Sequence, residues 1–250
     1  MSDRQILVLD HHKPVDVEAG NIMHINPHIF GIDGSKDISG AGVVYFFSTA
    51  LDEQNKDMSH IAIVGAIGDN QEDNGFSELT SEIVADAEKL DLINVNKGLK
   101  LFGIQTRPLH KALEYCTDPY IPDVSNSESG VIQFLNELKI PAREDKGFRK
   151  VIDLSQDEMQ RLIAGIIMKR KNEENPEDVL GNIYTLPNER LGHSLRDAKE
   201  FSTLLNATGR LNRASLGISV CLGNEKAKSK ANALSKEYKK EIVNAMNWFR

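Results

Sequence analysis

The chain has 250 residues, enough for one large domain or two modest ones, and 40% of them are hydrophobic, which suffices for ordinary cores. With 30 Lys and Arg against 37 Asp and Glu, the net charge of −7 excludes nucleic-acid binding by overall positive charge, so any such surface must be a local basic patch. Cys116 and Cys221 lack metal-ligand spacing and predict reduced thiols, and no apolar run reaches the ~18 residues that span a bilayer, so we expect a soluble cytoplasmic protein.

The first part of the chain predicts two strands followed by helices. Residues 4–10 contain a continuous apolar run, Ile6 to Leu9, which is typical of a strand buried on both faces, and residues 22–26 predict a second strand. Ser39 suits the N-cap of a helix. The apolar segment 59–68 is expected to be helical and to carry Asp69 at its end, and residues 76–92 have the spacing of a solvent-faced helix.

The second part is expected to begin with an inserted or linking module, because residues 93–126 are irregular and rich in prolines. Residues 127–139 and 155–171 predict helices, and Ser155 and Glu158 form a capping box at the start of the second. A strand is expected at 183–186, and helices at 194–207 and 224–250. Residues 214–222 alternate like a strand but would also serve as a buried helix, and both alternatives stay open.

Asp10, His11 and His12 follow the first predicted strand, and Pro14 ends it because proline cannot donate to a sheet ladder. Reactive groups in open α/β sheets lie just beyond the carboxyl ends of the strands, so this position is suited to an active site. A surface histidine pair beside a turn is the alternative for an isolated Asp-His-His sequence.

Three further segments follow this motif in order: Asn21-Ile-Met-His-Ile-Asn-Pro-His-Ile-Phe-Gly, Ser39-Gly-Ala-Gly-Val-Val-Tyr and Ile63-Val-Gly-Ala-Ile-Gly-Asp-Asn. Together they resemble the DHH phosphoesterase superfamily, and in particular its archaeal RecJ-like single-strand nucleases of the GINS-associated type. The resemblance runs across nearly the whole chain. It implies an α/β fold with a partial DHH-type parallel sheet and flanking helices, a mostly helical inserted module, and the start of a C-terminal accessory domain.

The resemblance also implies a site for Mn²⁺ or Mg²⁺, in which His11 and Asp69 are metal ligands and His12 contacts the scissile phosphate. Asp10 is expected to assist catalysis by orienting the His11 ring, because ligating imidazoles usually donate their other N–H to a carboxylate or carbonyl. Ser39 and Gly40, at a helix N-terminus, are candidates for binding phosphate, with close packing as the alternative role of the glycine.

The segment Asn206-Ala-Thr-Gly-Arg-Leu-Asn-Arg resembles the start of the accessory substrate-binding region in the RecJ-like proteins. Arg210 and Arg213 are therefore candidates for clamping a phosphate of a single strand, because guanidinium groups match phosphate oxygens. A contact that holds a domain interface is the alternative for either arginine.

The family's Asp-x-Asp motifs cannot fit into the nine residues that precede Asp10, and the Gly-Gly-Gly-His region is also missing. His11 and Asp69 alone are too few ligands to hold two cations tightly. Three explanations follow: the chain is a fragment of a longer nuclease, it is a degenerate relative, or a second polypeptide completes the site. We expect a fragment. The expected domains are a partial DHH domain (1–92), a helical module (93–180) and an accessory region or a return to the DHH domain (181–250).

The expected function is a metal-dependent phosphodiesterase, a RecJ-like exonuclease acting on single-stranded DNA or RNA in DNA replication and repair. One alternative is a catalytically inactive replisome adaptor that binds GINS and accompanies the replicative helicase. Another is a phosphodiesterase for short oligonucleotides or cyclic dinucleotides. The expected partners are thus single-stranded nucleic acid and, for the adaptor, GINS, with no membrane.

Overall fold

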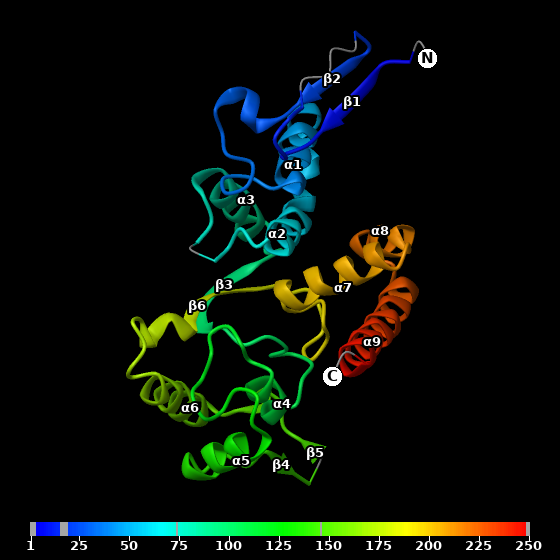
Figure 1. The fold of residues 1–250 in the computed structure, drawn as a ribbon. Helices are drawn as coiled ribbons and strands as arrows, with labels where there is room; N and C mark the ends of the chain where they lie inside the picture. The colour runs from blue at the N-terminus through cyan, green and yellow to red at the C-terminus, as the bar shows by residue number, and fades with distance from the viewer. Residues whose placement is uncertain (1–3, 16–19, 74, 146, 249–250) are drawn as a thin grey trace. The chain divides into compact units, whose positions relative to one another are not determined.

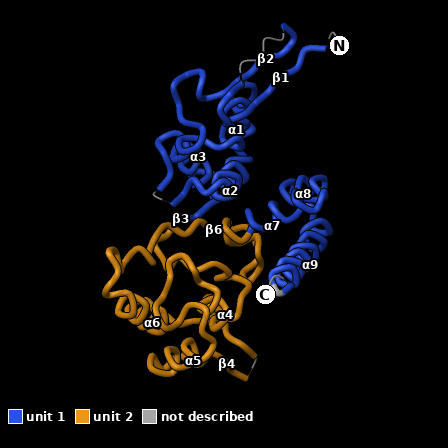
Figure 2. Tube along the Cα trace, viewed as in Figure 1, with its two compact units in different colours: residues 1–94, 201–250 blue, residues 95–200 orange. Residues whose placement is uncertain are grey.

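The computed structural model describes residues 4–15, 20–73, 75–145 and 147–248, and it has the predicted α/β fold (Figure 1). Contacts within the chain divide it into two units (Figure 2). Unit 1 comprises residues 1–94 and 201–250, and unit 2 comprises residues 95–200. The domain ranges expected from the sequence, with boundaries after residues 92 and 180, stay predictions.

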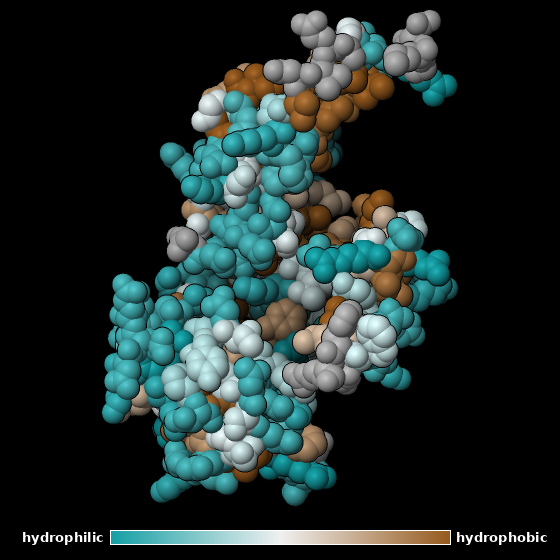
Figure 3. Space-filling view, viewed as in Figure 1, coloured by the Kyte–Doolittle hydropathy of each residue, from teal (hydrophilic) through white to brown (hydrophobic). Residues whose placement is uncertain are grey.

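The sheet of unit 1 consists of β1 (Ile6–Leu9) and β2 (Ile22–Ile25), which pair in parallel with Ile6 opposite Ile22. We expected β1 to be buried on both faces, but Ile6 is 45% and Leu7 is 42% exposed. Met23 of β2 is also exposed, and apolar surface gathers around these strands in Figure 3. Among the described residues β1 pairs with β2 alone, and a two-stranded sheet leaves much of its apolar surface uncovered.

The core of unit 1 is built from α1 (Gly40–Leu51), α2 (Ser59–Gly68) and α3 (Glu78–Lys89), with α2 packed against both other helices (Figure 1). Two short 3₁₀ helices, η1 (Pro27–Phe30) and η2 (Glu53–Met58), complete this part. A Cβ atom at Gly65 would lie 2.4 Å from that of Ala41, so glycine is required for α1 and α2 to approach closely. The predicted helices at Ser39, 59–68 and 76–92 are confirmed.

Three later helices also belong wholly or partly to unit 1: α7 (Ala198–Arg210), of which residues 201–210 lie in this unit, α8 (Ala214–Cys221) and α9 (Glu225–Trp248). Of the two alternatives for 214–222, the structure has the helix. The last predicted helix is confirmed up to Trp248, and residues 249–250 lie outside the described residues. Gly68, at the end of α2, faces Ser202 and Asn206 of α7.

Unit 2 combines short strands with helices around its own core. Its elements are β3 (Asn94–Leu99, whose first residue belongs to unit 1), α4 (Leu109–Glu114), α5 (Glu128–Glu137), β4 (Arg143–Glu144), β5 (Gly147–Phe148), η3 (Val151–Asp153), α6 (Gln156–Lys169), η4 (Pro176–Val179) and β6 (Leu180–Thr185). β3 pairs with β6, and β4 with β5. The capping box predicted at Ser155 and Glu158 is present at the start of α6.

The core of unit 2 gathers apolar residues from all of its helices, including Leu113 of α4, Leu135 of α5 and Leu162 of α6. Arg149 is a buried cation beside this core, and its guanidinium forms a double hydrogen bond to Glu158 at 2.7 Å. This pair holds the pKa of Glu158 at about 2. In the described part of the chain, no helix is long and apolar enough to cross a membrane.

Candidate active site

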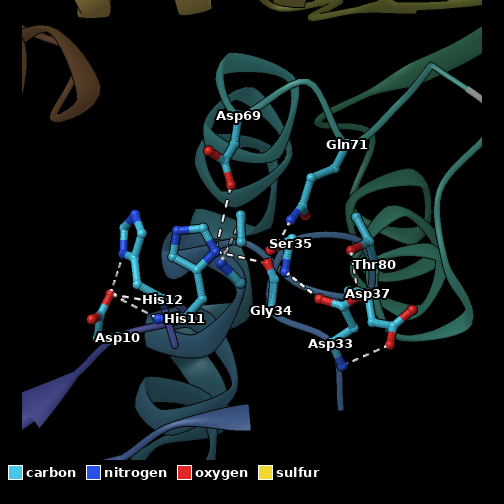
Figure 4. Close-up of polar contacts among 12 residues, drawn as sticks. Asp10, His11, His12, Asp33, Gly34, Ser35, Asp37, Asp69, Gln71 and Thr80 are labelled. Carbon is cyan, nitrogen blue, oxygen red and sulfur yellow. Dashed lines mark hydrogen bonds and ion pairs between the residues drawn. The ribbon is translucent and has the colours of Figure 1, made fainter. Parts of the chain in front are cut away.

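The Asp-His-His motif lies at the carboxyl end of β1, as its position after the apolar run predicts (Figure 4). β1 ends at Leu9 and the chain bends at His12, so the ring centroids of His11 and His12 lie 4.3 Å apart, yet the two side chains differ in exposure. The 77% exposed ring of His12 and the 12% exposed ring of His11 therefore meet very different surroundings. The motif thus presents one open imidazole and one enclosed imidazole.

Asp10 orients His12, not His11 as we expected. Its Oδ1 lies 2.8 Å from Nδ1 of His12 and also accepts the backbone N–H groups of His11 and His12. The hydrogen bond from the His12 ring lowers the pKa of Asp10 to about 2, and the same hydrogen bond raises the pKa of His12. Asp10 therefore favours the cationic form of the exposed imidazole. The expected contact with the His11 ring is not made, because Nδ1 of that ring faces the Gly34 carbonyl oxygen and the Asp10 carboxylate is taken up by the turn and by His12.

The ring of His11 is held by a backbone carbonyl. Its Nδ1 lies 2.8 Å from the carbonyl oxygen of Gly34, in the loop between β2 and α1. The same nitrogen lies 3.6 Å from Oδ2 of Asp69, at the end of α2 (Figure 4). The structure thus brings His11 and Asp69 together, although 58 positions separate them in the sequence.

Asp69 occupies the C-cap position of α2, where its backbone N–H donates to carbonyls of the last helical turn. Asn70 then adopts a left-handed conformation with φ of 57°, which ends the helix and turns the chain. After this turn, the Gln71 side chain donates through Nε2 to the carbonyl of Gly34 at 3.1 Å. The turn after α2 therefore carries two groups of the site. The Asp69 carboxylate lies beside the His11 ring, and the Gln71 amide donates to the Gly34 carbonyl that this ring contacts.

A cavity of about 250 Å³ adjoins His11 and Asp69. The N-terminus of α1 contributes to its wall, and there Ser39 is buried and caps the helix by accepting the Gly42 N–H at 3.2 Å. The lining residues are His11, Ser39, Gly40, Ala41, Val64, Gly65, Gly68, Asp69, Ser202, Leu205 and Asn206. Polar groups from four separate segments of unit 1 therefore converge on one small space.

The remaining predicted phosphate ligands, Arg210 and Arg213, are not among the residues that line this cavity. The guanidinium of Arg210 donates to the hydroxyl of Tyr238 at 3.2 Å, so it links the end of α7 to α9. Arg213 is exposed at the N-cap of α8. The structure thus separates both arginines from the group formed by His11, Asp69, Ser39 and Gly40.

The side chains at the tip of β1 suit a divalent cation. One ligand atom from each of Asp10, His11 and His12 lies within 4.8 Å of the others, and Asp69 adds a second carboxylate beside His11. Carboxylate oxygens and imidazole nitrogens without a thiolate are the donors that Mn²⁺ accepts, and Mg²⁺ prefers the oxygens. The donor chemistry therefore fits the metal that the resemblance implies.

Comparison with known proteins agrees with this geometry. Residues 101–182 match the DHH-CID domain family. The uncharacterised protein MJ0831 of Methanocaldococcus jannaschii is 34% identical over 243 residues, which cover 96% of this chain and 52% of that protein. The crystal structure of CDC45 from Entamoeba histolytica has a similar fold, with a TM-score of 0.67 and 12% identity over 96% of this chain and 53% of CDC45. The chain thus carries a DHH-CID domain match over residues 101–182 and has a fold similar to that of CDC45.

The chain spans about half the length of the curated relative that it matches. Its DHH-CID segment lies entirely within unit 2, whereas the Asp-His-His motif and the cavity lie in unit 1. The family match and the candidate active site therefore fall on different units, each with its own core.

The sequence alone did not reveal several residues that shape the candidate site. Asn26, fully buried, donates to the backbone carbonyl of His12 at 2.8 Å, and Gly34 and Gln71 fix the His11 ring. Ser202 and Asn206 bring α7 to the cavity. Asn26 and Asn206 had a signal in the sequence, because each lies in a segment that carries the family resemblance. The others contribute through contacts that no local pattern reveals.

Proposed function

We propose that this chain carries the active site of a metal-dependent phosphodiesterase, a RecJ-like exonuclease that acts on single-stranded DNA or RNA. The observation that supports it most is the approach of His11 and Asp69, whose Nδ1 and Oδ2 lie 3.6 Å apart beside the cavity. Two potential metal ligands from distant segments rarely meet at the end of a strand without a functional reason, because reactive groups of α/β proteins concentrate there.

In this proposal Asp69 and the His11 ring nitrogen that does not face Gly34 hold Mn²⁺ or Mg²⁺. A divalent ion of this kind polarises a phosphoryl oxygen and lowers the pKa of bound water. The exposed ring of His12 contacts the scissile phosphate, and its hydrogen bond to Asp10, which raises the pKa of His12, favours the cationic form of that ring. A cationic imidazole stabilises the negative charge that develops on the phosphate oxygens.

Ser39 and Gly40 serve as the phosphate-binding end of the cavity in this proposal. They lie at the N-terminus of α1, a helix of 12 residues, where backbone N–H groups and the helix dipole favour an anion. The cavity, of about 250 Å³, leaves room beside this helix end for a small group such as a phosphate.

The test is binding and cleavage by the chain with Mn²⁺ added. Electron paramagnetic resonance measures free Mn²⁺, and end-labelled single-stranded DNA, RNA and a dinucleotide serve as substrates. We expect H11A and D69N to lose Mn²⁺ binding and metal-dependent cleavage, while D57N, at an exposed acid of η2, keeps both. Undiminished cleavage by H11A would exclude this site, and a preference for the dinucleotide over the long strand would favour the small-substrate phosphodiesterase.

A second candidate function is a non-catalytic adaptor that binds GINS through unit 2. The observation that favours it is the DHH-CID match, which lies in a unit with its own core and apart from the Asp-His-His motif. We expect H11A and D69N to retain GINS in a pull-down if this function is correct, with no cleavage by the wild type in Mn²⁺. Loss of GINS binding in either variant, or cleavage by the wild type, would count against it.

A further inference from the structure

The contact between His11 and Gly34 fixes which ring nitrogen carries the proton. A backbone carbonyl oxygen can only accept hydrogen bonds, so the Nδ1 that lies 2.8 Å from it must carry a proton, and in the neutral imidazole this is the single N–H of the ring. The lone pair then resides on Nε2. A Cβ at Gly40 would lie 3.9 Å from Nε2, and Gly40 lines the cavity, so this nitrogen faces the N-terminus of α1.

The Gly34 carbonyl is itself held from a second side. It accepts the Nε2–H of Gln71 at 3.1 Å, so both of its lone pairs are engaged, one by His11 and one by Gln71 (Figure 4). A carbonyl with a single partner can tilt away from the ring. With two partners on separate elements its direction is determined, and with it the direction of the His11 ring.

The loop around Gly34 is anchored by its own acids. Asp33 accepts the N–H of Ser35 at 2.9 Å, and Asp37 accepts the N–H of Asp33 at 3.0 Å. The backbone carbonyl of Asp37 accepts the hydroxyl of Ser77, the N-cap of α3, and that of Thr80 at 3.3 Å. These bonds place the loop against α3 but leave the Gly34 carbonyl to be oriented by Gln71.

Gln71 is buried at 7% exposure, and its Oε1 has no hydrogen-bond partner among the described residues. A buried polar atom without a partner is unfavourable for folding, so an apolar side chain of similar size would serve stability at least as well. The side chain contributes its amide donor to one atom, the Gly34 carbonyl oxygen. This is the arrangement expected of a group that orients a metal ligand through an intermediate partner.

We infer that Gln71 is the positioning residue of the metal site: through the Gly34 carbonyl it holds His11 with its proton on Nδ1 and presents Nε2 to the cation. The inference rests on the proposed metal site. Gln71 follows Asp69 by two residues on the same turn, so a single turn supplies one proposed ligand and orients the other.

The test compares wild type with Q71M, which keeps the length of the side chain but lacks the donor, and with Q71N, which is too short to reach Gly34. Q54M is the matched control, because Gln54 is exposed in η2 of the same unit. Nitrogen-15 NMR of labelled histidine, without metal, identifies the protonated ring nitrogen of His11, whose signals are assigned by their loss in H11A. Electron paramagnetic resonance gives the Mn²⁺ affinity of each folded variant.

We expect wild type and Q54M to carry the His11 proton on Nδ1, and Q71M and Q71N to populate the other tautomer and bind Mn²⁺ about 10-fold more weakly. If Q71M keeps the wild-type tautomer of His11 or the wild-type Mn²⁺ affinity, the inference is overturned. If Q71M does not fold, the same two measurements on Q71N decide. If H11A binds Mn²⁺ as tightly as wild type, the proposed metal site fails. In that case the NMR measurement without metal still tests whether Gln71 determines the tautomer of His11.

Discussion

Replacing Gly34 with alanine tests how tightly the loop must approach the tip of β1. A Cβ at this position would lie 1.9 Å from the carbonyl oxygen of His11 and 2.8 Å from its carbonyl carbon. Carbon and oxygen atoms in close contact are about 3.3 Å apart, so the loop and the strand end must separate by about 1.4 Å. Both clashing atoms belong to the backbone, and a rotamer change cannot relieve the overlap.

A displacement of this size exceeds the ~0.5 Å within which a functional site tolerates error. Since the same movement pulls the Gly34 carbonyl away from the His11 ring, we expect G34A to weaken Mn²⁺ binding by about 10- to 100-fold. Overpacking should also lower the free energy of unfolding by about 1–3 kcal/mol. Gly34 is not one of the glycines with positive φ, so backbone strain makes no contribution and the effect is steric.

The assay is the rise in unfolding temperature on addition of Mn²⁺, which reports binding to the folded state, together with the free energy of unfolding in the absence of metal. G20A is the control, because a Cβ at Gly20 meets no atom within 4 Å. We expect Mn²⁺ to stabilise wild type and G20A at concentrations that leave G34A unchanged. Equal stabilisation of G34A and wild type would show that the loop can retreat without disturbing His11, and would refute the reasoning.

Three further predictions concern contacts elsewhere in the chain. R149M removes the double hydrogen bond to Glu158, whose side chain is 14% exposed and keeps the hydrogen bond from the Ser155 N–H, so it should lower the free energy of unfolding by about 1.5–3 kcal/mol at neutral pH. Chemical denaturation at several pH values should show this difference from wild type shrinking as the pH falls from about 4.5 toward 2, because Glu158 then becomes protonated. L162A, at a fully buried position of unit 2, should cost about 2–5 kcal/mol in the same assay. D10N should lower the pKa of His12 toward that of a free imidazole, and an NMR titration in which the pKa of His12 stays the same would contradict the role assigned to Asp10.

The elements that local patterns specify were predictable from the sequence. Ser155 and Glu158 predicted the start of α6, and Ser39 predicted the start of α1, because an N-cap residue bonds to backbone groups within the first turn of its helix. β3 was missed, because its sequence Asn-Val-Asn-Lys-Gly-Leu has neither an apolar run nor clear alternation. Pairing with β6, about 80 positions later, makes it a strand.

Only the part of the site that consists of reactive side chains was predictable from the sequence. The resemblance placed His11 and Asp69 together, and the structure brings them to 3.6 Å. The partner of the His11 ring was not predictable, because it is a backbone carbonyl, which every residue carries. Gly34 provides that carbonyl because it has no side chain, and Gln71 reaches it across 37 positions of sequence.

The pairing of β3 with β6 has a consequence for how such a chain can change over evolutionary time. The strand that leads into unit 2 lies beside a strand near its exit, so the chain enters and leaves this segment at neighbouring points. A segment whose two ends lie close together can change in length, or be replaced, without a change in the path of the rest of the chain. A change of length between β3 and β6 would therefore leave the pairing of these strands, and with it the ends of the segment, in place.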